Sequence, residues 1–146
     1  MKDSRIALDT SFVLSILVRR DHTPLAVEAL SWAQKRYQEI FIPQQVICEL
    51  VYVLEGIHRY TPGRRRLSRR EIREIVCSVL NTPKVVCERR GEVLEALDFY
   101  VDKGLSFGDA VIVARMRSME IKDLLSFDED FRGVEGIRVY PEKENG

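Results

Sequence analysis

The side chains of this sequence that could do chemistry are mainly carboxylates. Only two histidines are present, His22 and His58, and each stands in a locally polar stretch. Chemistry that needs a pair of histidine ligands or a Ser-His-Asp triad therefore has little to work with. Acidic residues number 23, so finding several of them proves nothing. Their settings along the chain decide which of them are candidates for a functional site.

Asp9 is the last residue of 5–9, a short segment with the pattern of a buried strand. Open parallel sheets place ligand sites beyond the carboxyl ends of their strands, which makes Asp9 a candidate. Its alternative role is the N-cap of a helix that begins near Phe12. Thr10 or Ser11 could cap that helix instead, so the position leaves both roles open.

Glu49 belongs to a predicted amphipathic helix. At 100° per residue it lies about 40° from Val53, on the edge of the apolar stripe rather than opposite it. Glu55 points further from the centre of the stripe. A glutamate at such a boundary is usually a surface residue whose stem packs on apolar neighbours. Position alone therefore leaves Glu49 open between a surface role and a functional one.

Asp109 stands in the first turn of a helix in which residues 110–114 are apolar on all sides, so we expect this helix to be buried. Ser106 has the spacing to cap the helix, with Asp109 at the third helical position. Capping explains the residue type but not the burial. A carboxylate at the mouth of a buried helix receives backbone N–H groups, binds a cation, or does both.

Asp128 and Asp130 lie in an acidic segment after the fourth predicted strand. Three acids within three positions commonly form a solvated loop. Phe127 and Phe131 flank them and predict that the loop is held against the domain. If the sheet is parallel, this loop lies near the same edge as Asp9.

Short apolar segments alternate with helical patterns along the chain. The predicted strands are 5–9, 40–42, 84–87, 123–125 and 137–139. The predicted helices are 12–18, 24–37, 43–59, 68–81, 90–103 and 109–119. Ser68 and Glu71 have the spacing of a capping box, and Gly104 suits the position after a helix end. This alternation predicts an α/β fold, a three-layer α/β/α sandwich around a mostly parallel sheet, with residues 1–146 forming a single domain.

Composition narrows the protein class. The hydrophobic share is 45% and the charged share 32%, as in ordinary globular domains. No apolar run reaches the roughly 18 residues of a transmembrane helix, and the N-terminal residues lack the pattern of a signal peptide. The three cysteines are widely spaced without a CxxC motif, which favours reduced thiols over a disulfide framework or a zinc site. We therefore expect a cytoplasmic protein that does not associate with membranes.

Positive charge is concentrated in one stretch, although basic and acidic residues balance at 23 each. Six of the ten residues from Arg64 to Arg73 are arginine. Such a patch can contact phosphates or can simply be solvated, with nearby glutamates offsetting part of its charge. The arginines that could contact nucleic acid are Arg64, Arg65, Arg66, Arg69, Arg70 and Arg73.

The carboxylate settings, taken together, resemble the four successive motifs of PIN-domain proteins. The matching segments are Ile-Ala-Leu-Asp9-Thr-Ser, Ile42-Pro-Gln-Gln-Val-Ile-Cys-Glu49-Leu, Leu105-Ser-Phe-Gly-Asp109-Ala-Val-Ile-Val-Ala and Leu125-Ser-Phe-Asp128-Glu-Asp-Phe. The resemblance runs from about residue 5 to residue 140, in the family's order and with its usual gaps. By size, the chain is most similar to the VapC-like toxin ribonucleases of prokaryotic toxin–antitoxin modules. The arginine stretch is not part of the family's pattern.

The resemblance implies an acidic core of Asp9, Glu49 and Asp109, completed by Asp128 or, in its place, Asp130. It implies hydroxyl support from Thr10 and Ser11, and also from Ser126. Converging carboxylates repel one another, and Mg²⁺ or Mn²⁺ would relieve that repulsion and activate water against a phosphodiester. The implied activity is metal-dependent cleavage of RNA that leaves a 5′-phosphate and a 3′-hydroxyl. The implied partners are an antitoxin protein and a second copy of the chain in a homodimer.

The sequence fits three other functions less well. A haloacid-dehalogenase-like phosphatase would need a second aspartate two positions after Asp9, where the chain has Ser11. A receiver domain would need a phosphorylatable aspartate after a middle strand, near residues 50–60, where an apolar helix is predicted instead. A catalytically silent PIN-like module that binds RNA or protein is the remaining alternative, and the presence of all four acids argues against it.

Overall fold

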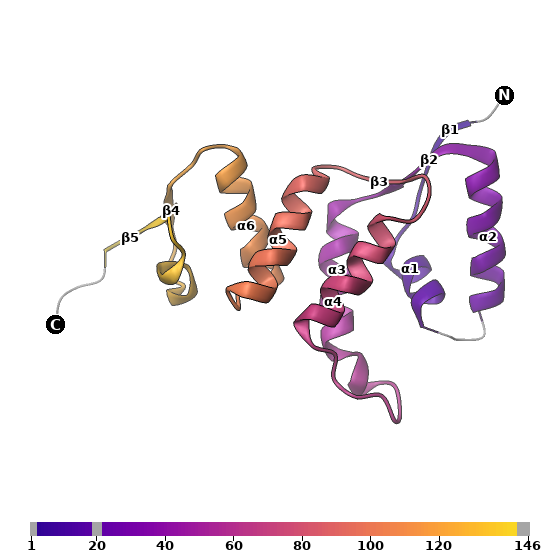
Figure 1. Cartoon of the computed structure of the whole chain (residues 1–146), viewed down its shortest axis with the longest axis horizontal. Helices are drawn as coiled ribbons and strands as arrows, with labels where there is room; N and C mark the ends of the chain where they lie inside the picture. The colour runs from indigo at the N-terminus through magenta and orange to yellow at the C-terminus, as the bar shows by residue number, and fades with distance from the viewer. Residues whose placement is uncertain (1–2, 19–21, 143–146) are drawn as a thin grey trace. The chain divides into compact units, whose positions relative to one another are not determined.

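The computed structural model describes residues 3–18 and 22–142 (Figure 1). The chain forms two compact units, unit 1 (Met1–Arg90) and unit 2 (Gly91–Gly146). All strand pairs of the described residues are parallel, three strands in unit 1 and two in unit 2. Helices separate the first four strands from one another, as the alternating pattern predicts, and the α/β class is confirmed.

The sheet of unit 1 has the order β1-β2-β3. Its strands are β1 (Asp3–Ala7), β2 (Tyr37–Ile42) and β3 (Val85–Cys87). Ile40 in the middle strand lies opposite Ile6 on one side and Val85 on the other. Ile40 and Ile42 are fully buried, so the sheet contributes directly to the core. The N–H of Leu8 donates to the carbonyl of Phe41 at 3.0 Å and carries the pairing one residue beyond β1.

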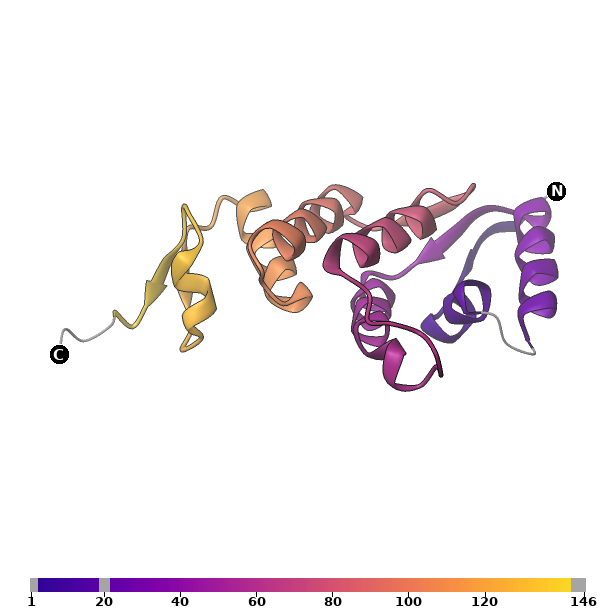
Figure 2. The same ribbon diagram turned by 60° about the horizontal axis from the view of Figure 1, so that its bottom comes forward.

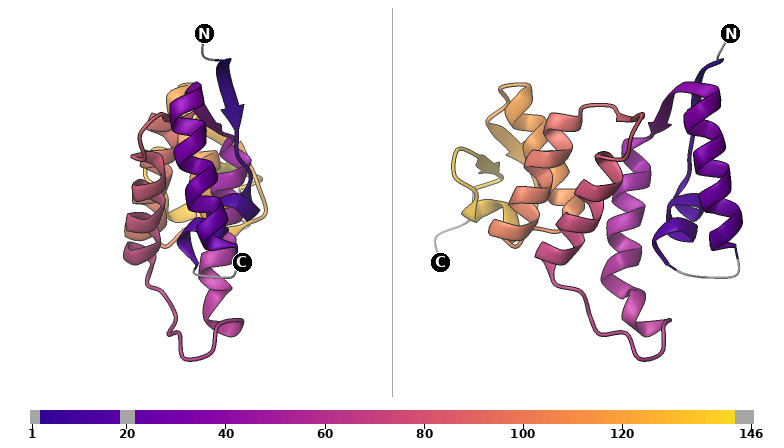
Figure 3. Two further views of the ribbon diagram at one scale, coloured as in Figure 1. Left: turned by 90° about the vertical axis from the view of Figure 1, so that its right-hand side faces the viewer. Right: turned by 45° about the vertical axis from the view of Figure 1, so that its right-hand side comes forward.

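Four helices accompany this sheet: α1 (Thr10–Leu17), α2 (Thr23–Arg36), α3 (Gln44–Gly56) and α4 (Arg69–Leu80). Helix α3 packs against both α1 and α4 (Figure 3). Leu50 and Leu54, at the centre of its apolar stripe, are fully buried, as is Val76 of α4. The capping box of α4 is present in full, because Ser68 accepts from the N–H of Glu71 at 3.1 Å and Glu71 accepts from the N–H of Ser68 at 3.1 Å.

Unit 2 comprises α5 (Arg90–Asp102), which begins at the last residue of unit 1, followed by α6 (Phe107–Ser118), β4 (Asp123–Leu125), η2 (Glu129–Gly133) and β5 (Arg138–Tyr140). The turn between α5 and α6 contains Gly104 at φ +67°, a conformation that favours glycine. The rings of Tyr100 and Phe107 pack edge to face with centroids 6.1 Å apart, and Arg115 pairs with Glu92 at 3.0 Å. These contacts hold α5 against α6.

Several element boundaries differ from the predictions for local reasons. Helix α1 is capped by Asp9 rather than by Thr10 or Ser11. Helix α3 ends at Gly56 and continues as the 3-10 helix η1 (Ile57–Arg59). The acidic segment predicted as a loop forms the 3-10 helix η2, because Asp128 accepts a capping hydrogen bond from the N–H of Asp130. No helix in the described ranges is long and apolar enough to cross a membrane.

Candidate metal centre

Asp9 lies two residues beyond the end of β1 and caps α1. One of its carboxylate oxygens accepts hydrogen bonds from the N–H of Phe12 at 3.0 Å and from the hydroxyl of Ser11 at 2.8 Å. These two bonds, the one from Phe12 first, lower the pKa of Asp9 below its ordinary value. The carboxylate is exposed. It is therefore held ionised in a defined orientation at the surface.

Glu49 is exposed on α3 and connected to the segment that follows β1. The hydroxyl of Thr10 donates to Oε2 of Glu49 at 2.5 Å, across 39 residues of sequence. The side-chain amide of Gln45 donates to Oε1 of Glu49 at 3.0 Å. Each carboxylate oxygen thus has one donor and keeps a lone pair free for another partner. Gln45 was not among the predicted site residues, although its spacing of four from Glu49 on one helix could have indicated it.

Asp109 forms an acidic group with Asp128 and Asp130. One carboxylate oxygen from each residue lies within 4.8 Å of the other two. Asp109 is half-buried in the first turn of α6, and its N–H donates to the hydroxyl of Ser106 at 3.2 Å. Asp128 and Asp130 are exposed. The structure places both alternatives for the fourth acid beside Asp109.

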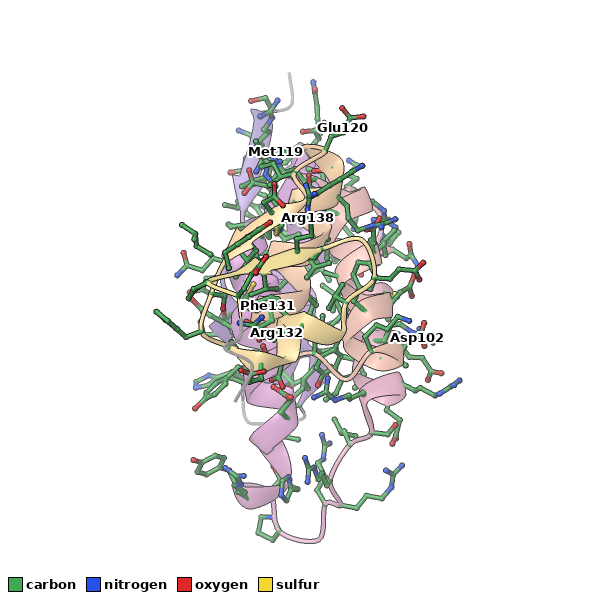
Figure 4. All side chains as sticks on the ribbon, turned by 90° about the vertical axis from the view of Figure 1, so that its left-hand side faces the viewer. Asp102, Met119, Glu120, Phe131, Arg132 and Arg138 are labelled. Carbon is green, nitrogen blue, oxygen red and sulfur yellow. The ribbon has the colours of Figure 1, made fainter. Side chains whose placement is uncertain are left out.

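The hydroxyl of Ser126 orders the segment that carries Asp128 and Asp130. Ser126 accepts from the N–H of Asp128 at 3.0 Å, and Asp128 accepts from the N–H of Asp130 at 2.9 Å. Figure 2 shows η2 beside the β4–β5 strand pair, and Figure 4 labels its residue Phe131. The prediction that two phenylalanines hold the loop is half right. Phe131 is buried, whereas Phe127 is 89% exposed.

Burial and like charge act together on Asp109. Partial burial is the largest cause that raises the pKa of its carboxyl above the ordinary 3.8, and the nearby charges of Asp128 and Asp130 raise it further. A hydrogen bond with Ser106 acts in the opposite direction.

The expectation that α6 is buried all round is wrong in one respect, since Ile112 is 44% exposed while Ala110 and Val113 are buried. One face of α6 is buried, and Ile112 lies on another.

The predicted acids therefore form two groups, one in each unit. The first comprises Asp9 and Glu49 with the hydroxyls of Thr10 and Ser11. The second comprises Asp109, Asp128 and Asp130 with the hydroxyl of Ser126. Both groups offer oxygen atoms as metal ligands, and neighbouring hydrogen bonds hold these side chains in place. This donor chemistry suits hard divalent cations such as Mg²⁺ or Mn²⁺.

The arginine stretch lies in unit 1, in the connection between η1 and α4 and in the first turns of α4. Arg64, Arg66 and Arg70 are exposed. Arg65 forms two hydrogen bonds with Glu71, at 2.8 and 2.6 Å. The bond from Arg65, followed by that from the N–H of Ser68, lowers the pKa of Glu71 to about 2.

Comparison with known proteins identifies the class to which this fold and these acids belong. The family model described as PIN domain matches residues 6–137, a range that extends through both units and contains all the candidate acids. The chain belongs to the PIN-domain family, whose three-layer α/β/α architecture is the predicted fold class.

One relative is the VapC ribonuclease of Aquifex aeolicus (strain VF5). It is 28% identical to this chain over 139 residues, which cover 94% of this chain and 98% of that protein. The chain is also similar to the crystal structure of Mycobacterium tuberculosis VapC20, a sarcin–ricin-loop-cleaving toxin, with 20% identity, a TM-score of 0.38 and coverage of 92% of this chain and 99% of that one. A third similarity is to VapBC2 from Rickettsia felis bound to a fragment of its promoter DNA, at 14% identity, a TM-score of 0.39 and coverage of 92% and 96%.

Proposed function

We propose that this protein is a metal-dependent endoribonuclease and the toxin of a toxin–antitoxin module. The observation that carries the proposal is the family match over residues 6–137, which includes Asp9, Glu49, Asp109 and Asp128 in the order expected for the motifs. The VapC ribonuclease of Aquifex aeolicus supports the substrate class, since the similarity extends over nearly the full length of both chains. RNA in the cytoplasm is then the substrate.

We further propose that the two units act as one nuclease domain over residues 1–146. In this proposal Asp9 and Glu49 from unit 1 act together with Asp109 and Asp128 from unit 2, and Asp130 assists. Mg²⁺ or Mn²⁺, when bound, supplies an activated water and stabilises charge on the attacking and leaving oxygens. Three carboxylate oxygens within 4.8 Å of one another fit such a cation, because their mutual repulsion is relieved by positive charge.

The protein's own side chains then hold these ligands in place. Thr10 and Gln45 fix the two oxygens of Glu49, and Ser11 and the N–H of Phe12 fix Asp9. Groups that orient metal ligands in this way typically change metal affinity or activity by about 10- to 100-fold when removed. The products expected from family resemblance carry a 5′-phosphate and a 3′-hydroxyl.

A toxin of this class needs partners. We propose that an antitoxin protein binds this chain and silences it, and that the active form is a homodimer. The proposal rests on the family and on the length-matched ribonuclease relative.

The test is cleavage of a mixed structured RNA pool by the purified protein with Mg²⁺, with Mn²⁺ and with EDTA. The Asp9→Asn, Asp109→Asn double variant should lose cleavage, whereas Asp102→Asn, an exposed aspartate on α5, should keep it as a matched control. If the target RNA is missing from the pool, metal titration of the same proteins still tests whether the carboxylates bind metal. Absence of both cleavage and metal binding would leave the silent RNA- or protein-binding module as the better account.

A further inference from the structure

The connection from η1 to α4 carries exposed cationic and aromatic side chains that the proposed active site does not use. We call residues 59–70 the arginine loop. Arg59, Arg64, Arg66 and Arg70 are exposed, and Tyr60 is 81% exposed. The loop projects beyond the end of α3, away from the sheet of unit 1 (Figure 1). A neutral chain with this local concentration of arginine has a surface suited to a polyanion.

A tight turn gives the loop a defined shape. The N–H of Arg64 donates to the carbonyl of Thr61 at 3.1 Å, with Pro62 and Gly63 between them. Gly63 has φ +77°, which fits proline followed by glycine at the centre of a type II turn. Such a turn brings its first and last residues, Thr61 and Arg64, within about 7 Å. Tyr60 and Arg65 flank it in the sequence.

Arg65 and Glu71 hold the other end of the loop. The guanidinium binds both carboxylate oxygens of Glu71, at 2.8 and 2.6 Å, and also donates to the carbonyl of Arg66 at 3.3 Å. Glu71 at the same time completes the capping box of α4. Arg65 therefore orders the loop against the start of the helix, and its charge is already compensated. Arg69 is half-buried and has a partner of its own.

Arg64, Arg66 and Arg70 remain as exposed guanidiniums on this ordered support. Within the described residues, none of the three is held by a carboxylate. Guanidinium groups bind phosphate oxygens through two parallel hydrogen bonds, a geometry that lysine does not offer. All six basic residues between 64 and 73 are arginine.

We infer that the arginine loop binds unpaired RNA, with Arg64, Arg66 and Arg70 contacting phosphates and Tyr60 stacking on a base. The exposed tyrosine favours single-stranded nucleic acid over an acidic protein, because aromatic side chains stack on bases that are not paired. Only the identification of this RNA as the substrate rests on the proposed function. Binding at the loop is independent of sequence and holds the strand while the acidic site cleaves it.

The test is the binding of a labelled, unstructured RNA of roughly 12 nucleotides. Fluorescence anisotropy is measured in EDTA, with Asp109→Asn as the background in all proteins, at salt concentrations from about 0.05 to 0.3 M. The test variant is Arg64→Gln, Arg66→Gln, Arg70→Gln. The matched control, Lys35→Gln, Lys103→Gln, Lys122→Gln, removes the same charge at exposed positions elsewhere. Thermal unfolding verifies that each variant is folded.

Three phosphate contacts at about 0.7 ions each should lower the salt-dependence slope by about 2, which corresponds to roughly 40-fold weaker binding near 0.15 M salt. The lysine control should bind with nearly the wild-type slope. Tyr60→Ala should weaken binding about 5- to 150-fold without changing the slope, and Tyr60→Phe should restore it. An unchanged slope in the arginine variant, or an equal loss in the lysine control, would overturn the inference.

These outcomes are separable from those of the nuclease proposal. Loss of binding in the arginine variant, together with neither cleavage nor metal binding by the wild-type protein, would support the loop as an RNA-binding surface and refute the enzyme. Cleavage by the wild-type protein together with unchanged binding in the arginine variant would refute the loop and keep the enzyme. An acidic protein partner would be indicated if RNA binding failed to respond to any of the loop substitutions.

Discussion

Replacing Asp109 by asparagine should stabilise the metal-free protein and abolish its response to metal. Asparagine has the shape of aspartate without its charge. Two unit charges 4.8 Å apart repel by about 0.9 kcal/mol in a water-like dielectric, and Asp109 faces both Asp128 and Asp130. Loss of a negative charge in the first turn of α6 costs about 0.3–1 kcal/mol in the opposite direction. The net gain is about 1 kcal/mol, or a rise in Tm of roughly 2–4 °C for a chain of this size.

Bound metal should make the wild-type protein more stable than Asp109→Asn, the reverse of the order without metal. At a metal concentration of about 100 times Kd, the wild-type protein gains about 2.7 kcal/mol, because only the folded chain assembles the carboxylates. The variant lacks one ligand of the group and gains little. Differential scanning calorimetry with EDTA and with increasing Mg²⁺ or Mn²⁺ measures both effects. Asp102→Asn, on the exposed surface of α5, serves as the control and should behave as the wild type does.

The pH dependence gives an independent check on the same carboxylate. Because the folded-state pKa of Asp109 is raised above its ordinary 3.8, the folded protein binds this proton more tightly than the unfolded chain. The wild-type protein therefore loses stability relative to Asp109→Asn as the pH rises through the window above 3.8. A variant that is less stable than wild type in EDTA, or equal responses of both proteins to metal, would refute the reasoning.

Three further predictions concern the supporting residues and the core. Thr10→Val removes the hydroxyl that holds Glu49 and should weaken metal binding or cleavage by about 10- to 100-fold, whereas Thr10→Ser should retain function. Isothermal titration with Mn²⁺ measures the change, and equal metal affinities of Thr10→Val and the wild-type protein would contradict the prediction. Ser68→Ala removes the cap of α4 and should lower the free energy of unfolding in urea by about 1 kcal/mol. The pKa of Glu71 is lowered to about 2, so this residue contributes stability above its ordinary pKa of 4.5 that is lost as the pH falls toward 2. A Tm that does not fall over this acid range would contradict the role of Glu71. Leu50→Ala in the buried stripe of α3 should cost about 2–5 kcal/mol in the same unfolding assay, and a loss near zero would mean that α3 is not packed as described.

Local sequence patterns predicted the secondary structure well because the interactions involved span only a few residues. The serine and glutamate that cap α4 are three positions apart, and Gly104 takes the left-handed conformation expected after α5. The apolar stripe of α3 follows from the helical period alone. The family resemblance rests on four short motifs in order, which is likewise information that the linear sequence carries.

Contacts between residues far apart in the sequence could not be predicted from local sequence patterns. The hydrogen bond from Thr10 to Glu49 joins positions 39 residues apart and depends on how α1 packs against α3. Phe127 is exposed while Phe131, four positions further along the chain, is buried. Periodicity cannot predict this difference, since it indicates which face of a helix or strand is apolar and not what the folded backbone places beside each residue.

The partners of individual charged side chains are likewise set by the tertiary structure and not by the local sequence. Arg65 is one of six arginines in its stretch, and nothing in its sequence position separates it from its neighbours. Folding pairs it with Glu71 and leaves Arg64 and Arg66 exposed. Similarly, Asp128 and Asp130 were alternatives along the chain, and the 3-10 turn places both beside Asp109. The reason is physical: charge is a property of residue type, whereas the partner of a charge is set by the distances that the folded backbone imposes.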